Sequence, residues 1–221
     1  MTANTEPMDP QAQEHLEETG HDTARGGMDP ALLGMMLFIA SEVMFFAALF
    51  AAFFNAAATV PDFWGILGEA IPLFHFPYLP IVMTAVLLTS SVTMQWATGR
   101  IRQGDRTGLN RAIAVTLGLG IFFMFMWAYD YYTLITSEDF GIDSGVYGTL
   151  FYTLTGFHGA HVFGGIVGLA VILSRGLAGQ FSRKHPVAVE AVHNYWHFVD
   201  IVWILLVNVM YVLPVLQGGS A

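Results

Sequence analysis

Cysteine is absent from the 221 residues, which excludes disulfides, thiolate metal sites, iron–sulfur clusters and cysteine nucleophiles. Charge is also scarce, at 11% of residues against 55% hydrophobic, with a mean hydropathy of +0.57. This composition is typical of an integral membrane protein and leaves no room for a second globular domain. The single lysine, Lys184, falls in a predicted loop, so a retinal Schiff base inside the membrane is excluded. Phosphate loops, nucleophile elbows and zinc-protease helices are missing from the sequence as well.

The first thirty residues are acidic and polar, and they explain much of the formal net charge of -9. Their acids face a single base, Arg25, and they show no apolar period. The segment lacks the basic start and apolar run of a signal peptide, and it is too acidic for a transit peptide. We expect 1–30 to be a flexible tail, followed by a membrane domain over 31–221.

Apolar stretches long enough to cross a bilayer dominate the rest, since a spanning helix needs about 20 such residues. They predict an all-α bundle of five transmembrane helices over about 31–54, 78–97, 112–134, 147–173 and 195–215. All eight Lys and Arg residues fall in the tail, the second loop and the fourth loop. The positive-inside rule therefore predicts a cytoplasmic N-terminus and an outer C-terminus.

Two further segments have an expected structural role. The apolar loop over 55–77 could form a short helix lying in the membrane interface. The fourth span carries small residues four apart, at Gly156, Ala160, Gly164 and Gly168, which form a narrow ridge that another helix can approach. The ridge fits packing within the bundle or docking of a second subunit.

Glu42 lies near the middle of the first span, beside small residues such as Ser41 and Ala40. An ionisable group at that depth is a functional hypothesis by default. One interpretation is a neutral carboxyl that exchanges a proton, because burial disfavours the charged form. The other is a structural carboxyl that is hydrogen-bonded between helices.

Further polar residues lie inside the other spans, and we group five of them as a buried polar set: His158, His161, His197, Asp200 and Asp130. Neutral imidazole can bind a metal or a haem, but the histidines of the fourth and fifth spans lie at different depths, which disfavours a shared haem. Hydrogen bonds to the helix backbone, to Asp200 or to Glu190 explain them without a metal, and Asp200 is well placed to pair with His197 on one helix face. For Asp130, a simple role at the membrane interface is at least as plausible as a functional role inside the membrane.

Four stretches, in this order, resemble subunit III of the haem–copper terminal oxidases of the cytochrome c or quinol oxidase type. They are 34–46 (GMMLFIASEVMFF), 143–148 (DSGVYG), 155–162 (TGFHGAHV) and 195–203 (YWHFVDIVW). The resemblance covers essentially everything after residue 30. It implies a chain without haem or copper of its own, which flanks a catalytic subunit I that carries them, together with subunit II, and supports proton uptake and enzyme stability.

The resemblance also carries residues across. Glu42 looks like the family's buried, carbodiimide-reactive glutamate, and Arg175 and Glu190 match positions near the family's bound phospholipid. Many members have seven spans, whereas this sequence matches from the third, a pattern that favours a short bacterial form in the plasma membrane. The resemblance does not decide whether the electron donor of the oxidase is cytochrome c or quinol.

Two other functions compete with that of an oxidase subunit. A small proton-coupled transporter could be built around Glu42, although no span is interrupted by proline at mid-membrane and no repeated half is visible. A diheme membrane cytochrome is disfavoured by the same unequal depths of the histidines.

Overall fold

The computed structural model describes residues 29–61, 63–64, 78–181 and 186–218, and five long helices make up most of them. They are α2 (Pro30–Thr59), α4 (Leu79–Gln103), α5 (Arg106–Ser137), α6 (Gly145–Leu177) and α7 (Val187–Val207). All five are long and apolar enough to cross a bilayer, counting α7 together with its continuation to Val212. The predicted all-α membrane protein with five spans is therefore confirmed.

The first four helices are longer than the spans predicted for them, because they continue past the apolar stretch to local end signals. Pro30 opens α2 after Asp29, whose carboxylate accepts a hydrogen bond from the backbone N–H of Ala31 at 2.8 Å. Gly104 ends α4 with a φ of 78°, a conformation that favours glycine. Asp105 then caps α5 by accepting from the backbone N–H of Gly108 at 2.9 Å.

The fifth span differs most from its predicted range, because its helix already begins at Val187 rather than near residue 195. His193 therefore lies well inside helical structure. At the other end α7 passes into a π-helical turn, η1 (Asn208–Val212), and then into α8 (Leu213–Gly218). Pro214 is the second residue of α8. Because proline has no backbone N–H, it leaves a carbonyl of the preceding turn without its α-helical hydrogen-bond partner.

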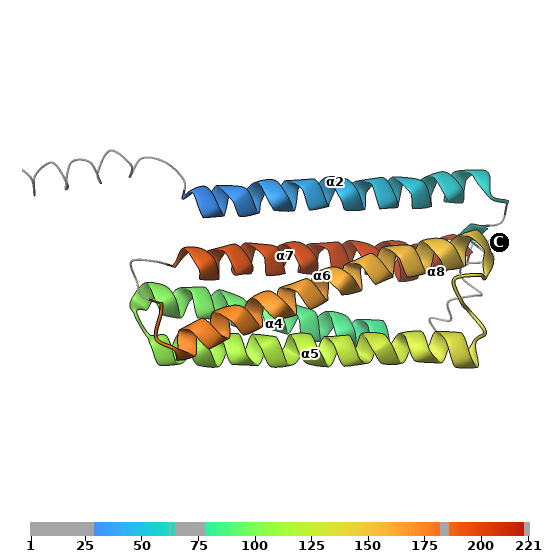
Figure 1. The fold of residues 1–221 in the computed structure, drawn as a ribbon. Helices are drawn as coiled ribbons and strands as arrows, with labels where there is room; N and C mark the ends of the chain where they lie inside the picture. The colour runs from blue at the N-terminus through green and yellow to red at the C-terminus, as the bar shows by residue number, and fades with distance from the viewer. Residues whose placement is uncertain (1–28, 62, 65–77, 182–185, 219–221) are drawn as a thin grey trace, which may run out of the picture.

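Helix α7 is the central element of the bundle, since it packs against α2, α4 and α6. Helix α5 lies against α4 and α6 on the opposite side from α2 (Figure 1). Among the described helices, α2 packs mainly against α7 and α6, and its buried residues are Phe46, Phe53 and Ala56. The bundle therefore has a well-packed body of four helices with α2 laid along one side.

One side chain joins the four helices of that body. Trp196 of α7 is fully buried, and its indole N–H donates to the hydroxyl of Ser90 on α4 at 2.9 Å. Its ring fills the space left by two glycines: a Cβ would lie 2.8 Å from the ring at Gly120 of α5 and 2.7 Å from it at Gly165 of α6. Both positions need glycine because the ring approaches the backbone so closely.

Several glycines of α6 lie against side chains of neighbouring helices. Gly159 packs against Trp127 in the same way, with a would-be Cβ at 2.8 Å, while Gly164 and Gly168 face Tyr195 and Val192 of α7. Part of the ridge therefore packs within the bundle, while Ala160 and Gly164 stay exposed, and docking of a second subunit there stays a prediction.

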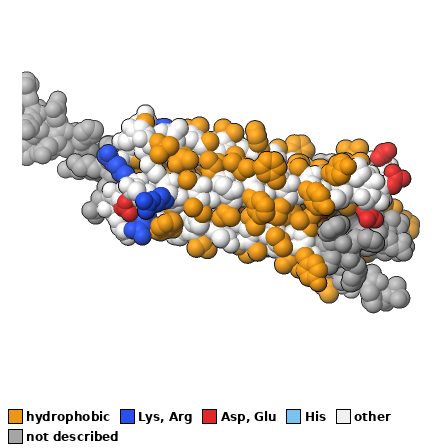
Figure 2. All heavy atoms as spheres, turned by 90° about the horizontal axis from the view of Figure 1, so that it is seen from below, with side chains coloured by type: hydrophobic (Ala, Val, Ile, Leu, Met, Phe, Trp, Pro, Cys, Tyr) orange, Lys and Arg blue, Asp and Glu red, His pale blue; other side chains and the backbone are white. Residues whose placement is uncertain are grey.

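On the face shown in Figure 2, charged side chains gather at the two ends of the bundle, with an apolar belt between them. The arginines of the described helices share one end, and they are Arg100, Arg102, Arg106, Arg111 and Arg175. Acidic residues mark the opposite end, where α5 meets α6, and they are Glu138, Asp139 and Asp143. We call these the arginine-rich end and the acidic end. That the arginine-rich end faces the cytoplasm stays a prediction from this charge asymmetry.

Some predictions concern residues outside the described ranges. They include nearly all of the tail over 1–30 and most of the interfacial helix expected over 55–77. At the start of that loop Phe63 is buried, and its ring lies 5.2 Å from the ring of Phe53 in an edge-to-face contact.

The packing of Trp196 can be tested by Gly165→Ala. We expect the unfolding free energy to fall by about 1–3 kcal/mol, because the added methyl would overlap the indole ring. Thermal unfolding in detergent, followed by circular dichroism, measures the change. Gly118→Ala is the matched control, since a Cβ there meets nothing within 4 Å. Equal stability of the two variants would contradict the proposed contact.

Candidate functional site: polar pairs inside the bundle

Glu42 is paired with a histidine of another helix. Its Oε2 lies 2.9 Å from Nε2 of His161 on α6, and the other ring nitrogen, Nδ1, lies 2.7 Å from the backbone carbonyl of Phe157. A carbonyl can only accept, so Nδ1 carries a proton. Nε2 then either accepts from a neutral Glu42 or donates, as imidazolium, to an ionised one. In both arrangements the pair holds one shared proton between α2 and α6.

The surroundings of this pair are largely aromatic. The ring of Phe46 stands edge-on to that of His161 at 5.0 Å, and the hydroxyl of Tyr195 donates to the backbone carbonyl of His161 at 3.0 Å. The side chains of Glu42 and His161 are 20% and 14% exposed, so the pair is covered but not sealed. The structure shows the hydrogen bond between helices that the structural interpretation of Glu42 requires. Exchange of a proton by this carboxyl stays a prediction.

A second polar group joins α4 to α7. The hydroxyl of Ser91 donates to Oδ2 of Asp200 and lies 2.7 Å from Nδ1 of His197. The direct distance between His197 Nδ1 and Asp200 Oδ2 is 3.8 Å, so the expected pair on one helix face is linked mainly through Ser91. Asp200 is buried, and its other oxygen, Oδ1, has no hydrogen-bond partner among the described residues.

The same two helices continue this pattern toward the arginine-rich end. His193 lies with Nδ1 at 3.2 Å from the hydroxyl of Thr98, and its ring stands 4.3 Å from that of His197. One turn further, Glu190 and Arg102 form an ion pair at 3.1 Å. We call this the α4–α7 polar seam, formed by Ser91, Thr98 and Arg102 of α4 and by Glu190, His193, His197 and Asp200 of α7.

His158 stands apart from both groups. It is fully buried in α6, its ring stacks on that of Trp203 at 5.2 Å, and Phe123 stands edge-on at 6.2 Å. Neither of its ring nitrogens has a hydrogen-bond partner among the described residues. Trp203 in turn donates its indole N–H to the hydroxyl of Thr84 at 3.0 Å.

Asp130 lies near the acidic end of α5. The hydroxyl of Tyr211, in the π-helical turn, points to its Oδ2 at a long 3.5 Å. One residue on, Tyr131 shares a hydrogen bond of 2.6 Å with Thr155 of α6. The five residues of the predicted polar set are therefore spread over several separate places in the bundle rather than forming one cluster.

The two residues matched to phospholipid contacts also lie apart. Arg175, at the end of α6, donates to the side chain of Gln180 at 3.0 Å and lies over the ring of Phe181. Glu190 is held by Arg102 of α4. The structure therefore gives each of them a protein partner and does not pair them with each other.

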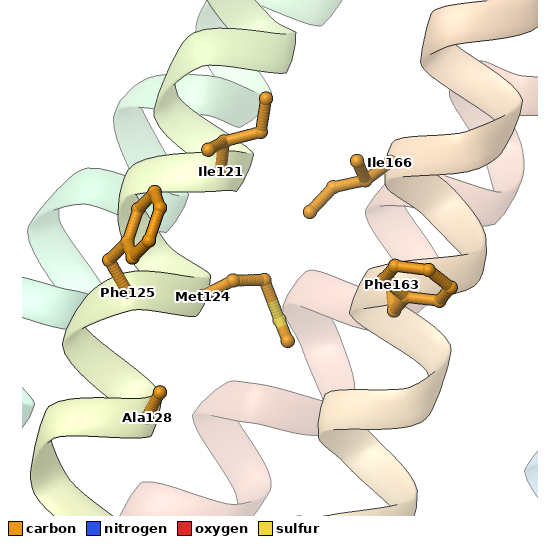
Figure 3. A pocket seen from close by; sticks show the side chains of 6 residues that line it. All are labelled: Ile121, Met124, Phe125, Ala128, Phe163 and Ile166. Carbon is orange, nitrogen blue, oxygen red and sulfur yellow. The ribbon is translucent and has the colours of Figure 1, made fainter.

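Two shallow grooves lie on the sides of the bundle. One runs between α5 and α6, where Met124 and Ile166 face each other across it (Figure 3), and its other lining residues are Ile121, Phe125, Ala128 and Phe163. The second lies between α2, α6 and α7 and is lined by Met35, Phe38, Gly164, Gly168, Val192 and Tyr195. Both linings are almost wholly apolar, which fits hydrocarbon chains better than polar ligands.

Sequence reasoning missed the partners that complete these sites. Ser91 and Thr98 are ordinary hydroxyl residues of an apolar span, and the pairing of Glu42 with His161 joins residues that lie far apart in the sequence. One signal was present: Thr84, Ser91 and Thr98 recur every seven residues and so share a face of α4. Among the described residues, no three His, Asp or Glu side chains converge as a metal site requires.

These features define a multi-pass helical membrane protein in which several polar side chains are paired inside the bundle. The comparison with known families makes this specific, because the family model described as cytochrome c oxidase subunit III matches residues 16–215. The chain belongs to the cytochrome c oxidase subunit III family.

Curated relatives agree with this assignment. The chain is 42% identical over 175 residues to cytochrome c oxidase subunit 3 of Oncorhynchus mykiss. It is 40% identical over 175 residues to the protein of that name from Sus scrofa. Each match covers 78% of this chain and 66% of the relative, so the chain spans about two thirds of the length of these relatives.

The Glu42–His161 pair can be tested by a double-mutant cycle with Glu42→Ala and His161→Ala. We expect a coupling energy of about 0.6–1.7 kcal/mol, the range of interhelical hydrogen bonds in membranes. Glu42→Gln should keep most of the stability, because its amide can still donate to Nε2. Unfolding in detergent–lipid mixtures supplies the free energies. Strictly additive single variants would rule out the pair.

Proposed function

We propose that the chain is an accessory subunit, without its own cofactor, of a proton-pumping haem–copper terminal oxidase. The observation that carries this proposal is the family match over residues 16–215. In that role it lies beside subunit I, which holds the haems and copper and reduces oxygen to water in aerobic respiration, with subunit II in the same complex. The relatives are named cytochrome c oxidase, which favours cytochrome c over quinol as the electron donor.

The contribution that we propose is support of proton uptake and of the stability of the catalytic subunit. Two features favour it. The Glu42–His161 pair holds one shared proton within the bundle, and the α4–α7 polar seam begins at the arginine-rich end. Such groups exchange protons without any redox centre in this chain. Ionisable residues inside membrane spans mark proton relays in many membrane proteins.

The arginine-rich end faces the cytoplasm in this proposal, by the positive-inside rule. Five arginines there also suit anionic lipid headgroups. Lipid binding near Arg175 and Glu190 is supported by the apolar groove between α2, α6 and α7, which is open to an acyl chain. The bacterial plasma membrane stays a prediction from the sequence; the relatives reported above come from a fish and a mammal.

The first experiment is purification of the tagged chain from native membranes in mild detergent, with a reduced-minus-oxidised spectrum and mass identification of the co-purifying proteins. We expect haem absorbance from a large catalytic partner, and we expect the haem spectrum of that partner to survive removal of this chain. A chain that purifies alone and colourless would contradict the accessory role.

Carbodiimide labelling tests the accessibility of Glu42 in the assembled complex. A hydrophobic carbodiimide reacts with protonated carboxyls that it reaches from the bilayer, and Glu42 lies at mid-helix with its side chain 20% exposed. We expect labelling of this chain, located by mass spectrometry, to be lost in Glu42→Gln. Glu138→Gln, at the end of α5, should label like the unaltered protein. Full labelling of the Glu42 variant would assign the reaction to another acid.

A further inference from the structure

The hydrogen atoms of the α4–α7 polar seam can be assigned from its hydroxyl groups. Ser91 has a single hydroxyl hydrogen, so when it donates to Asp200 its oxygen must accept from Nδ1 of His197. Thr98 donates in the same way to the backbone carbonyl of Met94 at 3.3 Å, so Nδ1 of His193 is the donor toward Thr98. Both neutral rings then carry their proton on Nδ1, and both leave Nε2 free to accept another.

The group of Ser91, His197 and Asp200 has a second arrangement that differs by one proton. If a proton binds Nε2 of His197, the Nδ1 proton can pass to the oxygen of Ser91 while Ser91 gives its own proton to Oδ2 of Asp200. The result is a neutral carboxyl, a neutral imidazole protonated on Nε2, and an intact hydroxyl. The N–H bond at Nδ1 and the original O–H bond of Ser91 break, and new O–H bonds form on Ser91 and Asp200. The incoming proton supplies the new N–H bond at Nε2, so the transfer balances and reverses by the same steps.

The exposure of the side chains gives this transfer a direction. The side chain of His197 is 33% exposed, whereas that of Asp200 is 5% exposed. Since Nδ1 of His197 is held by Ser91, a proton from outside can reach the ring only at Nε2. His197 is therefore the accessible end of the relay and Asp200 the buried end.

The rest of the seam connects His197 to the arginine-rich end. Glu190, His193, His197 and Asp200 follow one another at intervals of three, four and three residues, so they share one face of α7. From Glu190 to Asp200 this face extends about 15 Å along the helix. The rings of His193 and His197 are 4.3 Å apart, and Glu190 is fixed at the end by its ion pair with Arg102.

The setting of the two histidines also argues that this face does not lie against hydrocarbon. Both are half-buried within a spanning helix, and with the ring proton on Nδ1 each keeps Nε2 as an acceptor. Lipid chains offer no donor, and polar groups inside membranes normally face a bundle interior or a water-filled cavity. Water, or a polar surface of a neighbouring subunit, fits this face.

From this geometry we propose that the α4–α7 polar seam is a proton relay, which carries protons between the arginine-rich end and the buried carboxyl of Asp200. Hydrogen bonds of this chain join Ser91, His197 and Asp200, and the steps from Glu190 through His193 rest on the shared face of α7 and the close approach of the two imidazole rings. Only the use of the relay by an oxidase rests on the proposed function. The competing explanation is that the seam is a set of structural hydrogen bonds.

Infrared spectroscopy of the purified complex distinguishes the two. The carboxyl C=O band of Asp200 is identified by its loss in Asp200→Asn, and its shift is then followed in time after transfer to D₂O. We expect the exchange of this band to be at least ~10-fold slower in His197→Phe and in His197→Gln, because proton transfer through a positioned imidazole is lost. Thr93→Val is the matched control, since it removes a hydroxyl contact between α4 and α5 outside the seam.

His197→Gln is the decisive variant, because its amide can still bond to Ser91 but cannot pass a proton through. Exchange as fast as in the unaltered complex in this variant would overturn the relay, and so would the absence of any Asp200 carboxyl band between pH 5 and pH 9. Proton uptake during oxidase turnover is measured on the same samples. Slow band exchange with unaltered uptake would support the relay and contradict only its use by the oxidase.

Discussion

The burial of Trp196 is the contact on which the rest of this bundle depends. Its indole ring rests on the backbones of α5 and α6 at Gly120 and Gly165, and its N–H is bonded to Ser90 of α4. This one side chain therefore sets the rotation of α7 relative to three other helices. Close contact at glycine is the usual way for membrane helices to associate, because lipid supplies no hydrophobic force between them. Any larger residue at either glycine would move α7 and every polar group it carries.

With α7 fixed in this way, its other faces have defined neighbours. The residues next to Trp196 in sequence point to different partners: Tyr195 reaches α6 at the carbonyl of His161, and His197 reaches Ser91 of α4. The helix therefore separates two polar systems, the Glu42–His161 pair on one side and the α4–α7 polar seam on the other. Apolar and aromatic residues of α7, with Trp196 fully buried among them, lie between the two systems.

This arrangement suits a subunit that assists a redox enzyme without carrying a redox centre. Proton exchange needs hydrogen-bonded acids and bases at defined depths, and it does not need a metal or a nucleophile. The light packing of α2 fits the same role. Few of its residues are buried, so most of its surface is left for lipid or for a neighbouring subunit. The chain is organised to present polar groups within a membrane complex.

The sequence by itself determined the membrane class, the five spans and the separation of charge between the two ends, because these depend on apolar length and loop composition alone. The resemblance to subunit III also followed from local strings such as 195–203 (YWHFVDIVW). The end of α4 and the start of α5 were predicted less well, since capping by Gly104 and Asp105 lies outside the apolar stretches.

Only the tertiary structure decided which polar groups meet. His158 and His161 lie three residues apart in α6, yet one is stacked on Trp203 and the other is bonded to Glu42. Hydroxyls such as Ser91 gain a role only when α7 is placed beside α4. Pairing across helices depends on the rotation of each helix about its axis, which close packing at a few glycines fixes and which no local pattern in the sequence specifies.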